Sequence, residues 1–239
     1  MMYFYSQRGV SHAKRGIVNQ DAAYSIYYNG VEVLAIADGV GSCTYAHVGS
    51  NYIVNFMCEY TCNHFEELAN MSQKDLRSLI ITNFLIKYCI SNVNLNEALS
   101  TLLLVARKDS KLLVIQIGDG KILCIAKGHS SQVFPDDGLP MNVSYTWESE
   151  AACFEKTLLD LDRIQVDFML LCTDGVYKPD KAPVVFNSGL SYLDHTFTRE
   201  LYRRSNREEY ENFIKTVVTA SNGHDGDFDD KTAGIMVLR

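Results

Sequence analysis

Proline is scarce in this chain, and no stretch has the composition of an interdomain linker. Only 4 of the 239 residues are Pro, and no Ser/Gly-rich tract or long run of like charges interrupts the sequence. Linkers between domains usually have such compositions. With 47% hydrophobic residues, a chain of this length can bury a substantial core. We therefore expect residues 1–239 to form a single domain.

An excess of positive charge and long apolar runs are also missing. Lys and Arg number 22 against 29 Asp and Glu, so the formal net charge is −7. This balance disfavours the basic stripe that nucleic-acid binding usually needs. No stretch approaches the roughly 18 uncharged apolar residues of a transmembrane helix, and residues 1–8 do not resemble a signal peptide. The sequence predicts a cytoplasmic protein that binds neither nucleic acid nor membranes.

Closely spaced cysteine pairs are absent as well. The seven Cys residues are scattered, mostly within apolar runs, and none forms a Cys-x-x-Cys pair. Cys58 and Cys62 are one helical turn apart, but a zinc ion would need two further ligands that no neighbouring motif supplies. We expect reduced thiols that pack in the core of an intracellular protein.

The chain does contain a recurring pattern in which an apolar run ends on Asp. Three runs end on Asp-Gly, at Asp38, Asp119 and Asp174, and the acidic pair Asp229-Asp230 precedes the apolar run 232–238. Such runs are typical of buried strands. Two ionised carboxylates about 4 Å apart repel by roughly 4 kcal/mol at an effective dielectric constant of 20, so convergence of these strand ends would require cations. Ligand sets made only of oxygen favour Mg²⁺ or Mn²⁺.

Local patterns predict the order of the elements. Turn signals at Asn29-Gly30, Asp109-Ser110 and Asp119-Gly120 indicate hairpins between consecutive strands. The strands are expected over 22–28, 31–37, 99–107, 111–117 and 121–126. Apolar residues at helical spacing predict helices around 48–60, 76–88 and 210–218, the second with Ser72 and Asp75 in capping-box positions. The segments 135–150 and 178–196 lack periodicity and are expected to be surface loops.

Each acidic position also has a simpler interpretation. A lone Asp-Gly after a strand is usually only a turn, and Asp119 is the most open to this interpretation. The glycine after Asp38 lets the backbone approach a ligand, so the Gly39 carbonyl is a candidate cation ligand. The stretch 224–230 begins like an EF-hand, but its sixth position is Asp230 rather than Gly and its twelfth is Met236 rather than Glu. We expect Asp229 or Asp230 to reach a shared metal site instead.

The polar stretch 11–21 combines cationic side chains with a carboxylate just before the first hairpin. Lys14 or Arg15 would hold a phosphate group, and Asp21 would accept hydrogen bonds from metal-bound water. On its own, this stretch is an ordinary polar loop.

Seven short motifs follow one another along almost the whole chain. They are Ser11-His12-x-Lys14-x-Gly16, Asn19-Gln20-Asp21-Ala22, Ala37-Asp38-Gly39-Val40-Gly41-Ser42, Ser100-Thr101-Leu102, Ile117-Gly118-Asp119-Gly120, Thr173-Asp174-Gly175-Val176 and Asp229-Asp230-Lys231-Thr232. Each motif is weak alone, but their order from Ser11 to Thr232 is specific. Taken in this order, the motifs resemble the metal-dependent protein phosphatases of type 2C, in particular a compact bacterial branch.

The resemblance implies an α+β fold: a four-layer α/β/β/α sandwich of two mostly antiparallel sheets flanked by helices. It also implies a binuclear Mg²⁺ or Mn²⁺ centre at one end of the sandwich. By motif position, Asp38 would bridge both metals and the Gly39 carbonyl would bind one of them. Asp174 and Asp229 would complete the carboxylate set of the other. Asp119 with Asp174 would hold a third, weaker ion.

The implied activity is hydrolysis of phosphoserine and phosphothreonine in proteins by a water that bridges two divalent cations. The implied partners are a phosphorylated protein substrate and an opposing serine/threonine kinase. Asp21 would act through bound water, and His12 is a candidate general acid for the leaving alkoxide. Gln20 stands where many relatives have Glu, which lowers the negative charge at the second metal. Lys14 and Arg15 both fall near the usual phosphate-binding Arg.

Three other functions compete with this interpretation, and one of them, a calcium-binding module, is already weakened by the failed EF-hand pattern. A phosphatase of the haloacid-dehalogenase type carries a second Asp two residues after its nucleophilic Asp, but here Val40 follows Asp38 and Val176 follows Asp174. A pseudophosphatase, which would bind phosphoproteins or a kinase without turnover, would be expected to lack metal ligands. The chain keeps Asp38, Asp174 and Asp229.

Overall fold

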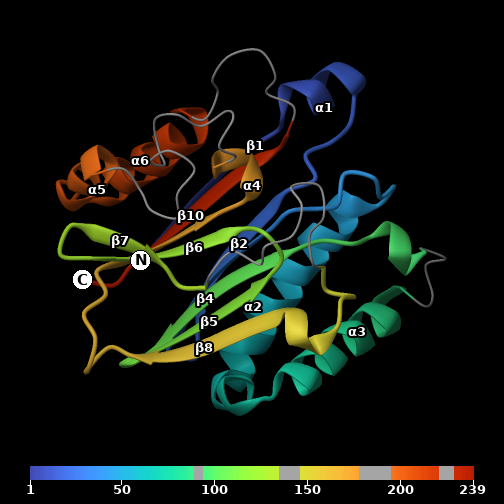
Figure 1. Cartoon of the computed structure of the whole chain (residues 1–239), viewed down its shortest axis with the longest axis horizontal. Coiled ribbons are helices and arrows are strands. Elements are labelled where there is room, and N and C mark those ends of the chain that lie inside the picture. The colour runs from blue at the N-terminus through green and yellow to red at the C-terminus, as the bar shows by residue number, and fades with distance from the viewer. Residues whose placement is uncertain (89–93, 135–145, 178–194, 221–228) are drawn as a thin grey trace.

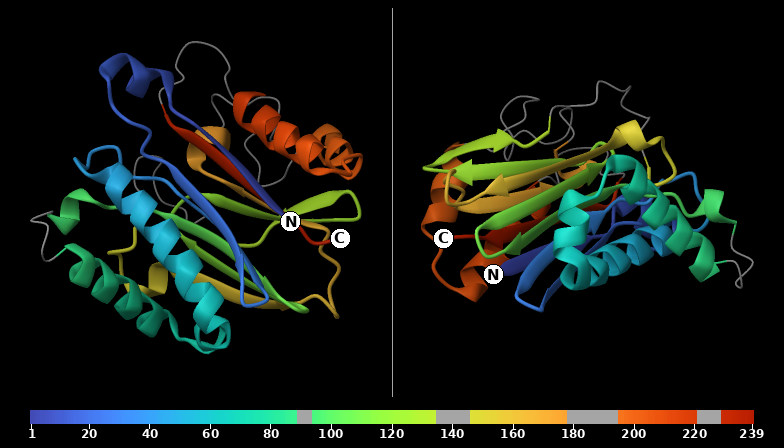
Figure 2. Two further views of the ribbon diagram at one scale, coloured as in Figure 1. Left: turned by 180° about the vertical axis from the view of Figure 1, so that it is seen from behind. Right: turned by 90° about the horizontal axis from the view of Figure 1, so that it is seen from below.

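A computed structural model describes residues 1–88, 94–134, 146–177, 195–220 and 229–239 of the chain. Within these ranges, ten strands form two five-stranded antiparallel sheets that lie face to face, and helices cover the outer face of each sheet (Figures 1 and 2). The predicted α+β sandwich is therefore confirmed.

The first sheet has the strand order β1-β10-β9-β6-β7. Its strands are β1 (Met2–Gln7), β10 (Lys231–Val237), β9 (Phe168–Cys172), β6 (Lys121–Ala126) and β7 (His129–Gln132). The second sheet has the order β2-β3-β4-β5-β8. Its strands are β2 (Ala22–Tyr28), β3 (Val31–Ala37), β4 (Leu102–Lys108), β5 (Lys111–Ile117) and β8 (Phe154–Asp160).

The helices divide between the two outer faces. Helices α2 (Ala46–Asn70) and α3 (Gln73–Tyr88) pack on the second sheet, whereas α5 (His195–Tyr202) and α6 (Arg207–Ala220) pack on the first. Short helical segments are α1 (Val10–Arg15), η1 (Leu95–Glu97), η2 (Ala151–Cys153) and α4 (Asp174–Tyr177). None of the described helices combines the length and apolar content that crossing a bilayer requires.

Strand β3 shows why its run is almost continuously apolar. Leu34 and Ile36 point into the core between the sheets, whereas Val33 and Ala35 point into the core beneath α2. Successive side chains of a strand face opposite sides, and both sides are buried here. A strand in the middle of a four-layer sandwich therefore loses the polar alternation of a half-exposed strand.

The two predicted hairpins of the second sheet are confirmed. Asn29 and Gly30 have φ values of 53° and 75°, the positive values that a type I′ turn requires at both central positions. Asp109 also has a positive φ, 53°, in the turn between β4 and β5. Strand β4 begins at Leu102, three residues later than expected.

The predicted hairpin at Asp119-Gly120 is wrong. Strand β5 pairs with β4 and β8, whereas β6 pairs with β7 and β9, so these two residues lie where the chain crosses from one sheet to the other. Gly118 has a φ of 99° at this crossing. Two buried apolar runs on either side of a turn signal have the same sequence pattern whether they share a sheet or not.

The three predicted helices are present, and α2 and α6 extend beyond their expected limits. At the start of α3, the amide of Asp75 donates to Ser72 Oγ at 3.1 Å, which confirms the cap. Helix α1 occupies part of the expected polar loop 11–21, and strands β1, β7 and β8 and helix α5 were not anticipated. Residues 135–145 and 178–194 of the expected surface loops lie outside the described residues.

Cys58 and Cys62 are buried on the inner side of α2. Their sulfur atoms lie 3.6 Å from the carbonyl oxygen of Tyr24 and 3.8 Å from that of Val31, respectively. Burial raises the pKa of the Cys58 thiol well above its usual range. These contacts confirm the interpretation of the pair as core thiols.

Candidate metal centre

Two of the predicted carboxylates lie opposite one another where β2 begins and β3 ends. The last pair of this antiparallel register is Ala22 with Ala37, so the next two residues, Asp21 and Asp38, lie opposite each other. The glycine after Asp38 brings the two segments together, because a Cβ atom on Gly39 would lie 2.8 Å from the carbonyl oxygen of Gln20. The glycine is therefore needed for contact between two backbone segments, whereas the sequence suggested close approach to a ligand.

A second pair of segments meets at the end of the first sheet. Cys172 pairs with Ala233, so Asp174 and the Asp229-Asp230 pair flank the same end of β9 and β10. A Cβ atom on Gly175 would lie only 2.0 Å from the carbonyl oxygen of Asp230. Only glycine fits at this contact, so the Asp174-Gly175 motif has the same packing role as Asp38-Gly39.

A buried threonine joins these two sheet ends. Thr173 Oγ1 donates to Asp21 Oδ2 at 2.8 Å and accepts from the amide of Thr232 at 2.9 Å. The amide of Thr173 in turn donates to the carbonyl oxygen of Thr232 at 2.9 Å. Asp21 from the second sheet is thus fixed against β9 and β10 of the first.

Backbone contacts also fix Asp38. Its amide donates to Thr101 Oγ1 at 2.9 Å, and the amide of Thr101 donates to the carbonyl oxygen of Asp38 at 2.8 Å. The residue just before β4 therefore holds the residue just after β3. Thr101 and Thr173 belong to the sequence motifs, but their role as supports depends on where the strands lie in space.

The electrostatics of the cluster show that its carboxylates lie close enough to repel. The pKa of Asp38 is raised well above its usual range, first by burial and then by the negative charges of Asp21, Asp174 and Asp229. Burial, together with the charge of Asp230, raises the pKa of Asp21 to about 8, although hydrogen bonds from Thr232, Thr173 and Asp38 act in the opposite direction. A site with these properties favours protons or cations.

The buried Oδ1 atom of Asp21 lacks a hydrogen-bond donor in the described part of the chain when the cluster is ionised. Asp21 is 5% exposed, and two carboxylates hydrogen bond to each other only if one is protonated. When Asp21 and Asp38 are both ionised, Asp21 Oδ1 has no hydrogen-bond partner among the described residues. A buried acceptor without a partner costs about 1–3 kcal/mol. A proton, a water or a water-bearing cation would remove that cost.

The described His, Cys, Asp and Glu side chains do not form a group of three that would hold one ion by themselves. Mg²⁺ and similar hard cations usually keep several waters and bind to only one or two protein carboxylates. Asp38, Asp174 and Asp229, with the Gly39 carbonyl, stay the predicted ligands of such a hydrated centre. The donor set contains only oxygen atoms, which suits Mg²⁺ or Mn²⁺.

Asp119 lies at the same end of the sandwich. It precedes β6, whose first residue, Lys121, pairs with Cys172, so Asp119 and Asp174 extend from neighbouring strands at one sheet end. Asp119 is half-buried. The position is consistent with the expected third ion, and its role as a ligand stays a prediction.

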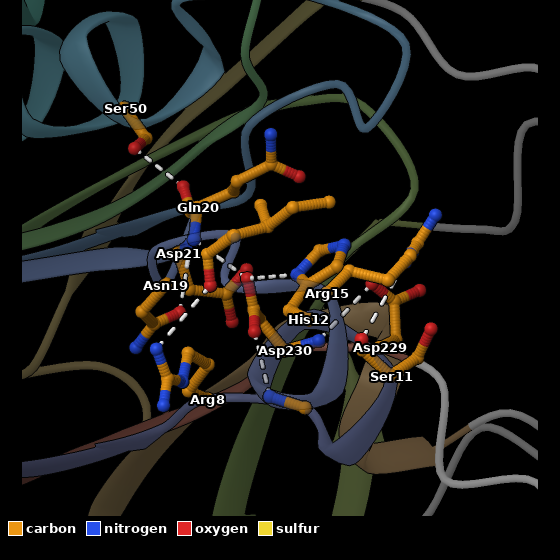
Figure 3. Close-up of polar contacts among 12 residues, drawn as sticks. Arg8, Ser11, His12, Arg15, Asn19, Gln20, Asp21, Ser50, Asp229 and Asp230 are labelled. Atoms are coloured by element: carbon orange, nitrogen blue, oxygen red, sulfur yellow. Dashed lines mark hydrogen bonds and ion pairs between the residues drawn. The ribbon is translucent and has the colours of Figure 1, made fainter.

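Asp230 has a different environment from Asp229. Its Oδ1 accepts from the amide of Gly9 at 2.7 Å, and its Oδ2 accepts from the amide of Gln20 at 2.6 Å and lies 2.9 Å from His12 Nδ1 (Figure 3). The charge of Asp229 instead acts on Asp38. Of the two residues left open by the sequence, Asp229 is therefore the better candidate ligand.

The N-terminal candidates separate in the structure. His12 is buried, at 7% exposure, on the inner side of α1, whereas Lys14 and Arg15 are exposed at the end of the same helix. Within the described part of the chain, neither cation forms an ion pair, and Arg15 Nε donates to the carbonyl oxygen of Ser11 at 3.4 Å. Their role in phosphate binding stays a prediction.

Comparison with solved structures gives the same fold. The serine/threonine phosphatase Stp1 from Staphylococcus aureus has a TM-score of 0.68 and 14% identity, with 100% of this chain and 94% of that chain covered. The catalytic domain of the serine/threonine protein phosphatase PstP, solved with 2 manganese ions, has a TM-score of 0.65 and 17% identity, with 98% and 96% covered.

A third solved structure, PppA, a key regulatory component of T6SS in Pseudomonas aeruginosa, has a TM-score of 0.64 and 17% identity. The match spans 98% of this chain and 96% of PppA. No curated protein sequence matches the chain significantly. The family model described as Protein phosphatase 2C matches residues 8–220, which is most of the sequence. The chain therefore belongs to the protein phosphatase 2C family.

Proposed function

We propose that this protein hydrolyses phosphoserine and phosphothreonine in other proteins with the help of two divalent cations, Mg²⁺ or Mn²⁺. The observation that carries the proposal is the convergence of four carboxylates at one end of the sandwich, Asp21 and Asp38 from the second sheet and Asp174 and Asp229 from the first. The raised pKa of Asp38 agrees with this arrangement. Carboxylates gathered from both sheets would repel one another without cations. Family membership supports the same chemistry, and the related PstP domain was solved with 2 manganese ions.

Two divalent cations at this site would activate a water molecule and neutralise the charge of a phosphate group. Asp38, Asp174, Asp229 and the Gly39 carbonyl would hold these ions, and Asp119 with Asp174 would hold a weaker third one. Asp21 would orient water near the ions from its fixed position against Thr173.

Other groups would act on the substrate. Lys14 and Arg15 are exposed on α1 and would attract the phosphate dianion, which the net charge of −7 otherwise repels. His12 would give a proton to the leaving alkoxide. The substrate would be a phosphorylated protein that a serine/threonine kinase modifies. A scaffold without turnover is less well supported, because the carboxylates expected of an active centre are present.

The direct test is release of phosphate from a phosphothreonine peptide with added Mn²⁺ or with a chelator. We expect activity only with the metal, and we expect Asp38→Asn to lower kcat/KM more than about 100-fold, since loss of residues that only support a ligand costs 10–100-fold. Asp109→Asn is a matched control, because Asp109 also follows an apolar strand but lies in the β4–β5 turn. Activity that persists in chelator and in Asp38→Asn would refute the proposal.

A further inference from the structure

Asp230 is one of the most completely buried charged residues in the described chain, with 1% exposure. It connects the start of β10 to three positions of the N-terminal segment through Gly9, His12 and Gln20. These partners lie 210 to 221 residues away in the sequence. Such a long-range set of contacts positions groups from the two ends of the chain relative to each other.

The contacts define where the hydrogen between Asp230 and His12 lies. A backbone N–H only donates, so Gly9 and Gln20 make both oxygens of Asp230 act as acceptors. The hydrogen shared with His12 therefore belongs to Nδ1, and Nε2 is the ring nitrogen that remains to exchange a proton with another group.

The pair adjoins the candidate metal centre from two directions. Gln20, which donates to Asp230, immediately precedes Asp21, and Asp230 itself immediately follows Asp229. The charge of Asp230 also contributes to the raised pKa of Asp21. His12 is thus held by Asp230, which directly follows Asp229 of the cluster and accepts from the residue before Asp21.

We propose that Asp230 is a positioning residue, which holds His12 with a hydrogen on Nδ1 so that Nε2 donates its proton to the leaving oxygen of the substrate. The inference rests on the proposed phosphatase activity. In the balanced step, a water oxygen forms a bond to phosphorus while the bond from phosphorus to the seryl or threonyl oxygen breaks. That oxygen keeps the electron pair and takes the proton of Nε2. The proton released by the water returns His12 to its starting state through solvent.

The test compares two substrates that differ in their need for a proton. The alkoxide that leaves a phosphothreonine peptide is strongly basic and requires protonation, whereas p-nitrophenolate leaves as a stable anion. We expect His12→Gln to lower kcat for the peptide by about 100-fold, the lower end of what general acid catalysis contributes, with little change in KM. The loss for p-nitrophenyl phosphate should be far smaller.

Asp230→Asn should reproduce this selective loss. The amide of Asn would donate to Nδ1, so the ring could no longer carry a hydrogen on both nitrogens and Nε2 would lose its capacity to release one. Both single variants remove the same interaction between His12 and Asp230. The double variant should therefore lose no more activity than either single variant. His12→Gln leaves the two backbone bonds of Asp230 intact and therefore tests proton donation even if Asp230→Asn folds poorly.

His64 and Glu67 supply a matched control pair. His64 Nδ1 lies 3.1 Å from Glu67 Oε2, but both side chains are about half exposed on α2. His64→Gln and Glu67→Gln should leave the activity on both substrates unchanged.

Equal losses on the two substrates, no loss on the peptide, or additive losses in the double variant would overturn the role of Asp230 and would assign it to packing alone. A wild-type protein that is inactive on both substrates with Mn²⁺ would instead refute the proposed phosphatase activity itself.

Discussion

Asp21→Asn should stabilise the metal-free protein, and the gain should grow as the pH rises. Asn has nearly the same shape as Asp, so its Oδ1 still accepts from Thr173 Oγ1. Its side-chain amide nitrogen can donate a hydrogen bond to Asp38. An ionised Asp21 offers only acceptor oxygens to an ionised Asp38. The substitution therefore removes a buried charge while it keeps the packing of the site.

The magnitude follows from the pKa of Asp21, which is raised from 3.8 to about 8, chiefly by burial. The folded state therefore binds this proton more tightly than the unfolded state, and the free energy of unfolding falls as the pH rises through that window. Four pKa units correspond to about 5 kcal/mol, which is an upper bound because a charged site relaxes and admits water. We expect a gain of roughly 2–4 kcal/mol for Asp21→Asn at pH 8 and almost none at pH 4.

Urea denaturation in the presence of a chelator, at pH 4, 6 and 8, measures this difference. Asp109→Asn in the distant β4–β5 turn is the control and should show no such trend. Added Mn²⁺ should stabilise the wild type more than Asp21→Asn at pH 8, since bound cations relieve the same repulsion. A stability difference that stays constant with pH would refute the reasoning.

Three further predictions concern stability away from the candidate site. Gly49→Ala should lose about 1–3 kcal/mol in urea denaturation, because its Cβ would lie 1.9 Å from the carbonyl oxygen of Ala98 and α2 would have to shift. Lys156→Met should lose about 1–3 kcal/mol in the same assay, because Nζ donates to carbonyl oxygens at the end of α2, two of them at 3.0 Å. Burial alone would raise the pKa of Asp167, but hydrogen bonds from Tyr202 and other donors lower it below 3.8. Asp167→Asn should therefore lose stability at pH 7 by thermal unfolding, and this loss should shrink as the pH falls below about 4.

Each of these predictions has a neighbouring control. Gly41→Ala should be nearly neutral, because the nearest atom to its Cβ would be 3.8 Å away. Lys74→Met on the exposed face of α3 should likewise change little. Full stability of Gly49→Ala or Lys156→Met, or a loss in Asp167→Asn that does not depend on pH, would contradict the corresponding structural account.

The part of the site that the sequence predicts depends on local chemistry. Asn29-Gly30 determines a type I′ hairpin, and the register of that hairpin alone makes Asp21 and Asp38 neighbours. The buried run of β3 could likewise be recognised because both of its faces meet apolar layers. These features follow from residues that lie close together in the chain.

The rest depends on contacts between distant segments. Nothing near His12 indicates that it is buried against Asp230, 218 residues away. The choice between Asp229 and Asp230 also required the position of β10 beside β1 and β9. The crossing at Asp119 was mistaken for a hairpin because a turn signal does not specify which sheet the next strand joins.

Anomalous diffraction from crystals soaked in Mn²⁺ tests the central claim most directly, namely that carboxylates from both sheets form one cation site. The account predicts two strong peaks bounded by Asp38, Asp174 and Asp229, and the loss of at least one of them in Asp38→Asn. Crystals of the wild type that show no manganese among these three residues would contradict it.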